Sequence, residues 1–250
     1  MNFDLNDDQR MLQEGAARYF EKSYDFHHRL ALARTGGGFS RDTWQAFADM
    51  GWLAAGIPEA HGGLGFSPIE LAVLAEEMGR NLVLEPFTAC AVLPAAVIAK
   101  VADDAQQAER LPTIASGECL YAVALSEPDA RGDLSRLAAR AAKQPDGSWR
   151  LDGRKSLVIG ASMADRLLVV ARASGPEGGL EGLALFDVAK DGPGVSLESV
   201  ALVDGTPSVL TLAYLFIENF QSNEDYYLSF YYTSVARFLR VVGFFMTVTV

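Results

Sequence analysis

The chain has 250 residues, of which half are hydrophobic and 21% are charged, a composition that excludes general disorder. Its formal net charge of −11 disfavours nucleic acids and anionic membrane surfaces as partners, because both carry negative charge. The two cysteines stand far apart and there are only three histidines, so we expect neither a disulfide framework nor a metal site. The polar N-terminus lacks the pattern of a targeting signal, and we expect a cytoplasmic protein.

The first part of the chain, residues 1–115, has the pattern of a helical domain. Asn6, with a glutamine three residues later, predicts a capping box at the start of a helix. Ser40 predicts the N-cap of a second helix that ends near Gly51. Ser67-Pro68-Ile69-Glu70 predicts a third helix start, because it combines an N-cap serine, a proline in the first turn and the glutamate of a capping box.

Two more helices are expected before residue 115. Residues Phe87–Lys100 are rich in alanine and valine and predict a buried helix, which Pro94 should kink. Residues Asp104–Arg110 predict a short surface helix.

From about Cys119 the pattern changes to short apolar segments separated by turn residues, among them Asp152-Gly153. The expected strands are Leu120–Leu125, Leu134–Ala142, Trp149–Leu151, Lys155–Ile159, Leu167–Ala171, Leu183–Val188 and Val195–Val200. Short strands without intervening helices favour an antiparallel β-barrel or sandwich over residues 116–212. The predicted fold class is therefore α+β, a helical domain followed by an antiparallel β domain.

The last stretch, residues 213–250, differs in composition from the rest. It holds eleven of the 25 aromatic side chains, no proline and one glycine. A membrane helix is one alternative for this tail, but Arg237 and Arg240 interrupt the apolar run, and each would cost about 2.5–3.5 kcal/mol at the bilayer centre.

Spacing alone predicts no catalytic constellation. The chain has no nucleophile-elbow, zinc-protease or P-loop signature. Gly62-Gly63-Leu64-Gly65 does not follow a predicted strand, which favours a turn between helices over a dinucleotide fingerprint. Glu76 and Glu77 are adjacent on a predicted helix, so at most one of them faces any given site. His61 is expected to be a surface residue.

Several motifs, taken in chain order over about residues 3–212, resemble those of acyl-CoA dehydrogenases. They are Gly51-Trp52-Leu53-Ala54-Ala55-Gly56-Ile57-Pro58-Glu59, Glu76-Glu77-Met78-Gly79-Arg80, Ser126-Glu127-Pro128-x-Ala130-x-x-Asp133, Leu151-Asp152-Gly153-x-Lys155 and Ala164-Asp165-Arg166-Leu167-Leu168-Val169-Val170. Within this family the chain most resembles the small-subunit type of pimeloyl-CoA dehydrogenase, which shares the run D-G-x-K-S-x-V.

This resemblance implies an FAD-dependent oxidoreductase that removes hydrogens from Cα and Cβ of an acyl-CoA thioester. It also implies reoxidation by an electron-transfer flavoprotein or a similar acceptor, and a homo- or hetero-oligomeric assembly. A carboxylate base must lie in a dry cleft beside the flavin, since the α C–H is acidified only when the thioester carbonyl is polarised.

By the same resemblance, two segments face the flavin. One is Ser126-Glu127-Pro128, in which Ser126 keeps the hydroxyl that the family places against the ring. The other is Leu157-Val158-Ile159, where the family commonly has W-I-T; Leu157 and Ile159 can pack against a ring but cannot donate to it. The alternative is that Leu157 and Ile159 are barrel core. Arg131 replaces a small residue of the family loop and is a candidate partner for a pyrophosphate or a substrate carboxylate, or it faces solvent.

In the family, a C-terminal helical bundle supplies the catalytic glutamate and much of the acyl pocket. The resemblance ends near Leu212, so we expect an atypical tail in place of the bundle, from a truncated or frame-shifted gene, and a chain that is inactive alone. Three hypotheses remain open: an acyl-CoA dehydrogenase or its flavin-binding subunit, a non-catalytic subunit of a heteromeric acyl-CoA dehydrogenase, and a membrane-tethered binding protein that uses the tail.

Overall fold

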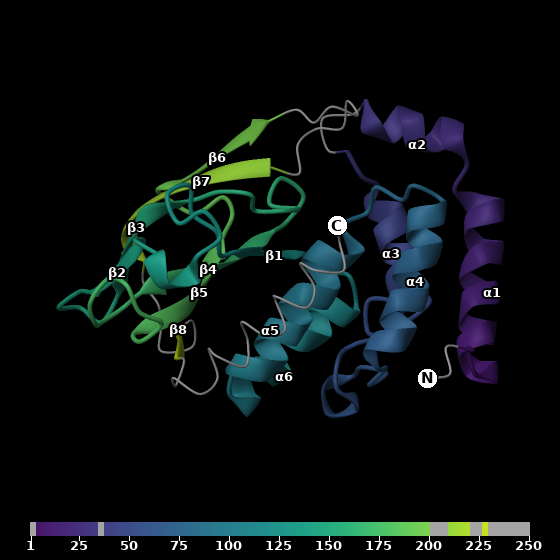
Figure 1. Ribbon diagram of the computed structural model, residues 1–250, viewed down its shortest axis with the longest axis horizontal. Helices are drawn as coiled ribbons and strands as arrows, with labels where there is room; N and C mark the ends of the chain where they lie inside the picture. The colour runs from purple at the N-terminus through teal and green to yellow at the C-terminus, as the bar shows by residue number, and fades with distance from the viewer. Residues whose placement is uncertain (1–3, 35–37, 201–209, 221–226, 230–250) are drawn as a thin grey trace.

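The computed structural model describes residues 4–34, 38–200, 210–220 and 227–229. A helical region comes first along the chain and a sheet follows it, and in Figure 1 the two parts lie side by side. The α-then-β order expected from the sequence is therefore confirmed.

The helices begin where the sequence supplies capping groups. Both capping boxes form, with Asn6 capping α1 and Ser67 capping α4, and the Ser40 side chain accepts the backbone N–H of Thr43 at the start of α3. These side chains satisfy amide groups that a helix start leaves without intrahelical acceptors. The helices are α1 (Asp7–Ser23), α2 (Phe26–Ala33), α3 (Arg41–Asp49), α4 (Pro68–Arg80), α5 (Leu93–Val101) and α6 (Asp104–Ala115), with a 3-10 turn at Glu59–His61.

The expected kinked helix over Phe87–Lys100 is two pieces. A π-helical segment, Thr88–Val92, runs directly into α5, and Pro94 lies just after the junction, where its missing N–H removes one bond from the helical run. The last helix, α6, is longer than predicted and is more than a surface helix, because Arg110, Leu111 and Ile114 are buried.

The sheet is mixed, so the expected antiparallel barrel or sandwich is corrected on this point. The strands are β1 (Tyr121–Ala124), β2 (Arg140–Lys143), β3 (Trp149–Lys155), β4 (Arg166–Arg172), β5 (Leu183–Ala189), β6 (Val195–Val200), β7 (Leu210–Phe220) and β8 (Tyr227–Ser229). They lie in the order β6-β7-β3-β2-β4-β5-β8, and β1 pairs with β4 off this path. The β1–β4 and β2–β4 pairs are parallel and the other pairs are antiparallel.

Three strand boundaries differ from the prediction. Asp152-Gly153 lies inside β3 and does not end it, and the segment after Lys155 is a loop. The predicted strand over Leu134–Ala142 is a 3-10 turn followed by β2. Strand β7 covers residues for which no strand was predicted, and it pairs with β3 and β6.

One continuous apolar core joins the helices to the sheet. On the helical side, Phe20, Phe47 and Trp52 pack their rings together, with the Phe47 and Trp52 centroids 5.2 Å apart. The core continues through α5 into β1, β4 and β5. No helix in the described part of the chain is long and apolar enough to cross a membrane. The atypical tail expected over residues 213–250 lies mostly outside the described residues.

Candidate functional site

Two loops of the β domain lie next to each other. The first leaves β1 and carries Ser126, Glu127 and Pro128, and the second follows β3. The backbone N–H of Ser156 donates to the Ser126 carbonyl over 2.9 Å, which joins the loops directly. The structure therefore brings together the two segments that the sequence nominated.

Glu127 is buried and its carboxylate is occupied by contacts within the protein. Its oxygens accept the backbone N–H groups of Ala138 and Ala139 at 2.6 and 3.1 Å, and Oε1 contacts Lys155 Nζ at 2.6 Å. Lys155 Nζ also donates to the Leu125 carbonyl at 3.2 Å. Burial lowers the pKa of Lys155, and the charge of Glu127 opposes that shift. Of this loop, Ser126 is half-buried and Pro128 is exposed.

The second loop turns two apolar side chains outward. Leu157 is 54% exposed and Ile159 is 50% exposed, while Val158 between them is fully buried. They are therefore not core residues, which removes the alternative that the sequence left open. Leu157 also has a φ of +55°, an uncommon conformation for a residue other than glycine. Such conformations persist where the surrounding structure imposes them and are concentrated at functional sites.

Ile159 belongs to the wall of a cavity of about 470 Å³ between the β domain and the helices. This volume is within the range of small-molecule sites, about 300–1,000 Å³. The lining is mostly apolar: Ala75, Met78 and Gly79 of α4, Leu82, Val83, Leu84, Pro86, Phe87, Thr88 and Ala89 of the next segment, and Ile159, Gly160 and Met163 of the β domain, with Gly38 and the charged Arg29 and Glu85. A second hollow, of about 310 Å³, lies beside Pro128, Arg140 and Arg154.

The buried carboxylate in the cavity wall, Glu85, is linked to the helical region. It accepts the backbone N–H of Ser40 at 3.1 Å, at the start of α3. Burial raises the pKa of Tyr24, and the nearby charge of Glu85 raises it further. The Tyr24 hydroxyl in turn accepts the backbone N–H of Leu84 at 2.9 Å. Leu84 and Glu85 together thus fix the cavity wall against the end of α1 and the start of α3.

Arg131 lies in an exposed turn after the first loop, with a φ of +51°. In the part of the chain that the structure describes, its guanidinium forms none of the ion pairs observed. It lies at the surface, five residues after Ser126 in the chain, and is not one of the residues that line the cavity.

Sequence reasoning missed two features of this site. Lys155 stood in a quoted motif, but no role was predicted for it, although a charged residue next to an apolar run was a signal of a buried pair. Glu85 was also missed. It precedes Pro86 and an apolar helix, and nothing local distinguishes it from a surface glutamate. No group of three or more His, Cys, Asp or Glu side chains with a metal-binding arrangement occurs among the described residues.

Comparison with known proteins gives consistent matches over most of the chain. Residues 6–118 match the family described as acyl-CoA dehydrogenase, N-terminal domain, and residues 122–219 match acyl-CoA dehydrogenase, middle domain. Residues 199–250 also match the description Bacillus/Clostridium GerA spore germination protein, a likeness limited to the end of the chain.

Individual relatives agree with these family matches. Acyl-CoA dehydrogenase FadE12 of Mycobacterium tuberculosis is 30% identical over 201 residues, which cover 79% of this chain and 51% of FadE12. A solved structure of an FAD-dependent dehydrogenase is 27% identical with a TM-score of 0.76, covering 96% of this chain and 61% of its own. The ChsE4-ChsE5 complex from Mycobacterium tuberculosis shares the fold, with 23% identity, a TM-score of 0.78, and coverage of 94% and 60%.

The chain spans about half the length of the curated relatives it matches. The two matched domains follow each other in the order of the helices and the sheet seen in the structure. The chain therefore belongs to the acyl-CoA dehydrogenase family, of which it contains the N-terminal and middle domains.

Proposed function

We propose that this chain takes part in the FAD-dependent α,β-dehydrogenation of an acyl-CoA thioester. The observation that carries the proposal is the pairing of the Ser126 loop with the outward-facing Leu157 and Ile159, at the edge of an apolar cavity. The relative described as an FAD-dependent dehydrogenase supports the choice of cofactor.

The residues present fit a flavin ring. Leu157 and Ile159 offer an exposed apolar surface within two residues of each other, and apolar surface of this kind gains free energy when a planar ring covers it. Ser126 is half-buried, its backbone is bonded to Ser156 just before this surface, and its hydroxyl can donate or accept one hydrogen bond. Bound FAD would supply the acceptor for the β-hydride.

The protein's own contribution is binding and exclusion of water. The cavity lined by Met78, Phe87 and Ile159 is apolar enough to hold an acyl chain, which would itself displace water from the lining that it covers. In the proposal, the carboxylate base comes from outside the described residues, either from this protein or from a partner subunit. An electron-transfer flavoprotein as acceptor and a cytoplasmic location stay predictions.

The alternative is a non-catalytic subunit of a heteromeric acyl-CoA dehydrogenase. It is favoured by Leu157 and Ile159, which give the ring no hydrogen-bond donor where the family commonly has tryptophan and threonine. The fold also occurs in the ChsE4-ChsE5 complex, which is an assembly of two differently named chains. In this alternative the exposed side chains of Leu157 and Ile159, which we call the apolar strip, contact a second, catalytically competent subunit.

The deciding experiment is the visible absorption spectrum of the purified chain, before and after incubation with FAD and removal of the excess. A retained flavin band supports the first proposal, and anaerobic addition of acyl-CoA thioesters of different chain lengths should then bleach it. A colourless protein that never retains FAD contradicts the first proposal and favours the non-catalytic subunit. That subunit should then form a stable complex with a full-length family member.

A further inference from the structure

A single buried ion pair links the two loops of the candidate site. Lys155, the last residue of β3, is completely buried, and its Nζ lies 2.6 Å from Glu127 Oε1 in the other loop. The same Nζ donates to the Leu125 carbonyl at 3.2 Å, so both of its hydrogen bonds end in the segment next to Ser126.

Glu127 extends this link to a third segment. Its two oxygens accept the backbone N–H groups of Ala138 and Ala139, just before β2. The carboxylate thus receives three donors from two segments, and charge-assisted bonds of this kind are short and directional. The link fixes where the Ser126 loop stands relative to the end of β3.

Stability alone does not account for a pair in this position. Removing two charges from water is costly, and apolar residues of similar volume often serve a core equally well. The residues next to the pair are the candidate flavin-facing ones: the half-buried Ser126 precedes Glu127, and the exposed Leu157 and Ile159 follow Lys155. A shift of either loop changes the distance between the Ser126 hydroxyl and the apolar strip.

We propose that Lys155 and Glu127 are positioning residues, which hold the Ser126 loop and the Leu157–Ile159 loop at the spacing that a flavin requires. The choice of flavin rests on the proposed function, whereas the positioning of the loops is a claim about this chain alone. Neither side chain needs to touch the cofactor, because both act through the backbone of the loops that they join.

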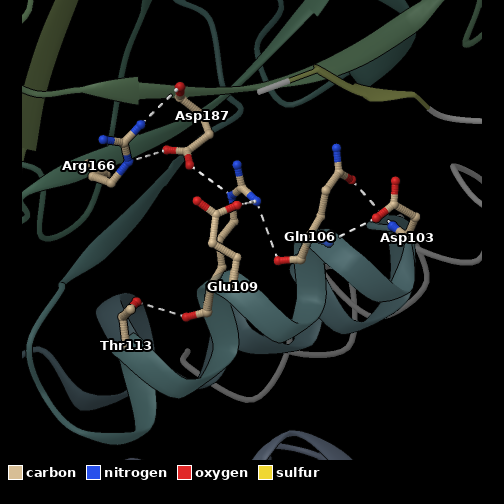
Figure 2. Close-up of polar contacts among 7 residues, drawn as sticks. Asp103, Gln106, Glu109, Thr113, Arg166 and Asp187 are labelled. Atoms are coloured by element: carbon tan, nitrogen blue, oxygen red, sulfur yellow. Dashed lines mark hydrogen bonds and ion pairs between the residues drawn. The ribbon is translucent and has the colours of Figure 1, made fainter. Parts of the chain in front are cut away.

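The chain contains a matched control, a second buried ion-pair cluster away from these loops. Figure 2 shows Asp187 of β5 between Arg166 and the side of α6. Asp187 Oδ1 lies 2.6 Å from Arg166 Nε, and Oδ2 lies 3.0 Å from Arg110 Nε. Like Glu127, Asp187 is a buried carboxylate with cationic partners, but it joins α6 to β4 and β5 and contacts neither site loop.

The test compares Lys155→Met and Glu127→Gln with Asp187→Asn in the full chain. Thermal unfolding by circular dichroism gives each variant's loss of stability, and titration of FAD fluorescence gives its flavin affinity at a temperature where all are folded. We expect the two site variants to bind FAD at least tenfold more weakly than the wild type, while Asp187→Asn, at a similar loss of Tm, changes affinity less than threefold. Equal effects of all three variants would overturn the positioning role.

A second readout does not depend on FAD. Amide hydrogen exchange of the chain without ligand reports whether the loops have separated, with the Ser156 amide as the marker because it donates to the Ser126 carbonyl. Lys155→Met should speed exchange of this amide at least tenfold, and Asp187→Asn should leave it within threefold. If the wild type fails to bind FAD, the proposed function fails, and exchange alone decides the positioning claim. Unchanged exchange in Lys155→Met would overturn it.

Discussion

Gly160 is the residue at which the site loop meets the helical region. Its φ is +79°, and an added Cβ would overlap the Sγ atom of Cys90 in the π-helical segment. Burial raises the pKa of the Cys90 thiol, so this side chain is a neutral packing group. Glycine is therefore required here both by backbone conformation and by space.

Gly160→Ala should lower the free energy of unfolding by about 2–4 kcal/mol, because it adds steric overlap to the strain of a positive φ. Urea denaturation measures this loss. The control is Gly147→Ala, where φ is +88° but no atom lies within 4 Å of the added Cβ, so only the strain remains. A Gly160 variant no less stable than the Gly147 variant would contradict the packing argument. Adding Cys90→Ala to the Gly160→Ala variant should restore the part of the stability that is lost to steric overlap.

Arg131 tests the substrate class suggested by the resemblance to small-subunit pimeloyl-CoA dehydrogenases. If its exposed guanidinium pairs with the free carboxylate of a dicarboxylic acyl-CoA, Arg131→Ala should reduce the preference for dicarboxylic over monocarboxylic substrates about tenfold. The ratio of the two kcat/KM values in a reconstituted holoenzyme measures this preference. The neighbouring surface variant Arg136→Ala is the control, and an unchanged ratio in Arg131→Ala would exclude the pairing.

For single residues, the sequence predicted which side chains are candidates for the site, but not whether each of them faces the core or solvent. Ser126, Leu157 and Ile159 could be nominated from their motifs. Whether Leu157 and Ile159 face the core or solvent depends on the register of a loop that has no period. The buried Lys155–Glu127 pair joins residues 28 positions apart, and no local pattern selects such a partner.

Among the helices, α1 and α4 are joined at their N-termini by Glu70. Its Oε2 accepts the backbone N–H of Ser67 at 2.8 Å in the capping box, and its Oε1 accepts the Gln9 side-chain amide at 2.7 Å. The bonds from Gln9 and Ser67 lower the pKa of Glu70 below its ordinary value of 4.5. Glu70 therefore stabilises the folded state at pH values above 4.5, and this contribution is lost as the pH falls through the lowered pKa.

Glu70→Gln should cost about 1 kcal/mol of stability at pH 7 and less at pH 3, where the wild-type carboxylate is itself being protonated. Urea midpoints of the two proteins at both pH values measure the difference. The control is Glu76→Gln, which breaks an exposed pair with Arg80 on the same helix and should change little. A Glu70 effect that stays constant from pH 7 to pH 3 would contradict the role of its charge.

The elements show which interactions a sequence encodes locally. The caps at Asn6, Ser40 and Ser67 were predicted because the capping residue and its amide are two or three positions apart. The parallel pairing of β1 with β4 could not be predicted, because it places Tyr121 opposite Arg166 and two other strands lie between them in the sequence. Asp152-Gly153 was misread as a turn because β3 tolerates an exposed aspartate and an interior glycine.

For the molecule as a whole, the order of helical and β regions followed from the change of period near Cys119, but the contacts between them did not. Figure 2 shows one such contact, where α6 meets β4 and β5 at Asp187. A charged residue inside an otherwise apolar strand was the available sign that Asp187 has a buried partner. Only the folded structure shows that one partner is Arg110, because Arg110 lies on a helix that the sequence predicted to be at the surface.

The exposed apolar strip has a consequence for the assembly of the whole molecule. Leu82 and Ile159 line the same cavity and are both at least half exposed, and Leu157 lies two residues away with a similar exposure. Apolar side chains gathered at one opening favour association, because contact with a second molecule removes them from water. We therefore expect the purified chain to form dimers or larger species at micromolar concentration.

Light scattering after size-exclusion chromatography measures this association, and combining Leu157→Ser with Ile159→Ser should shift the chain toward the monomer. The control combines Met11→Ser with Ile69→Ser, which removes apolar side chains that are 62% and 56% exposed on α1 and at the start of α4 and that do not line the cavity. If both double variants shift the distribution equally, association is a general effect of apolar surface. If only the site variant does, the strip is the surface through which this chain meets its partner, and added FAD should then compete with association.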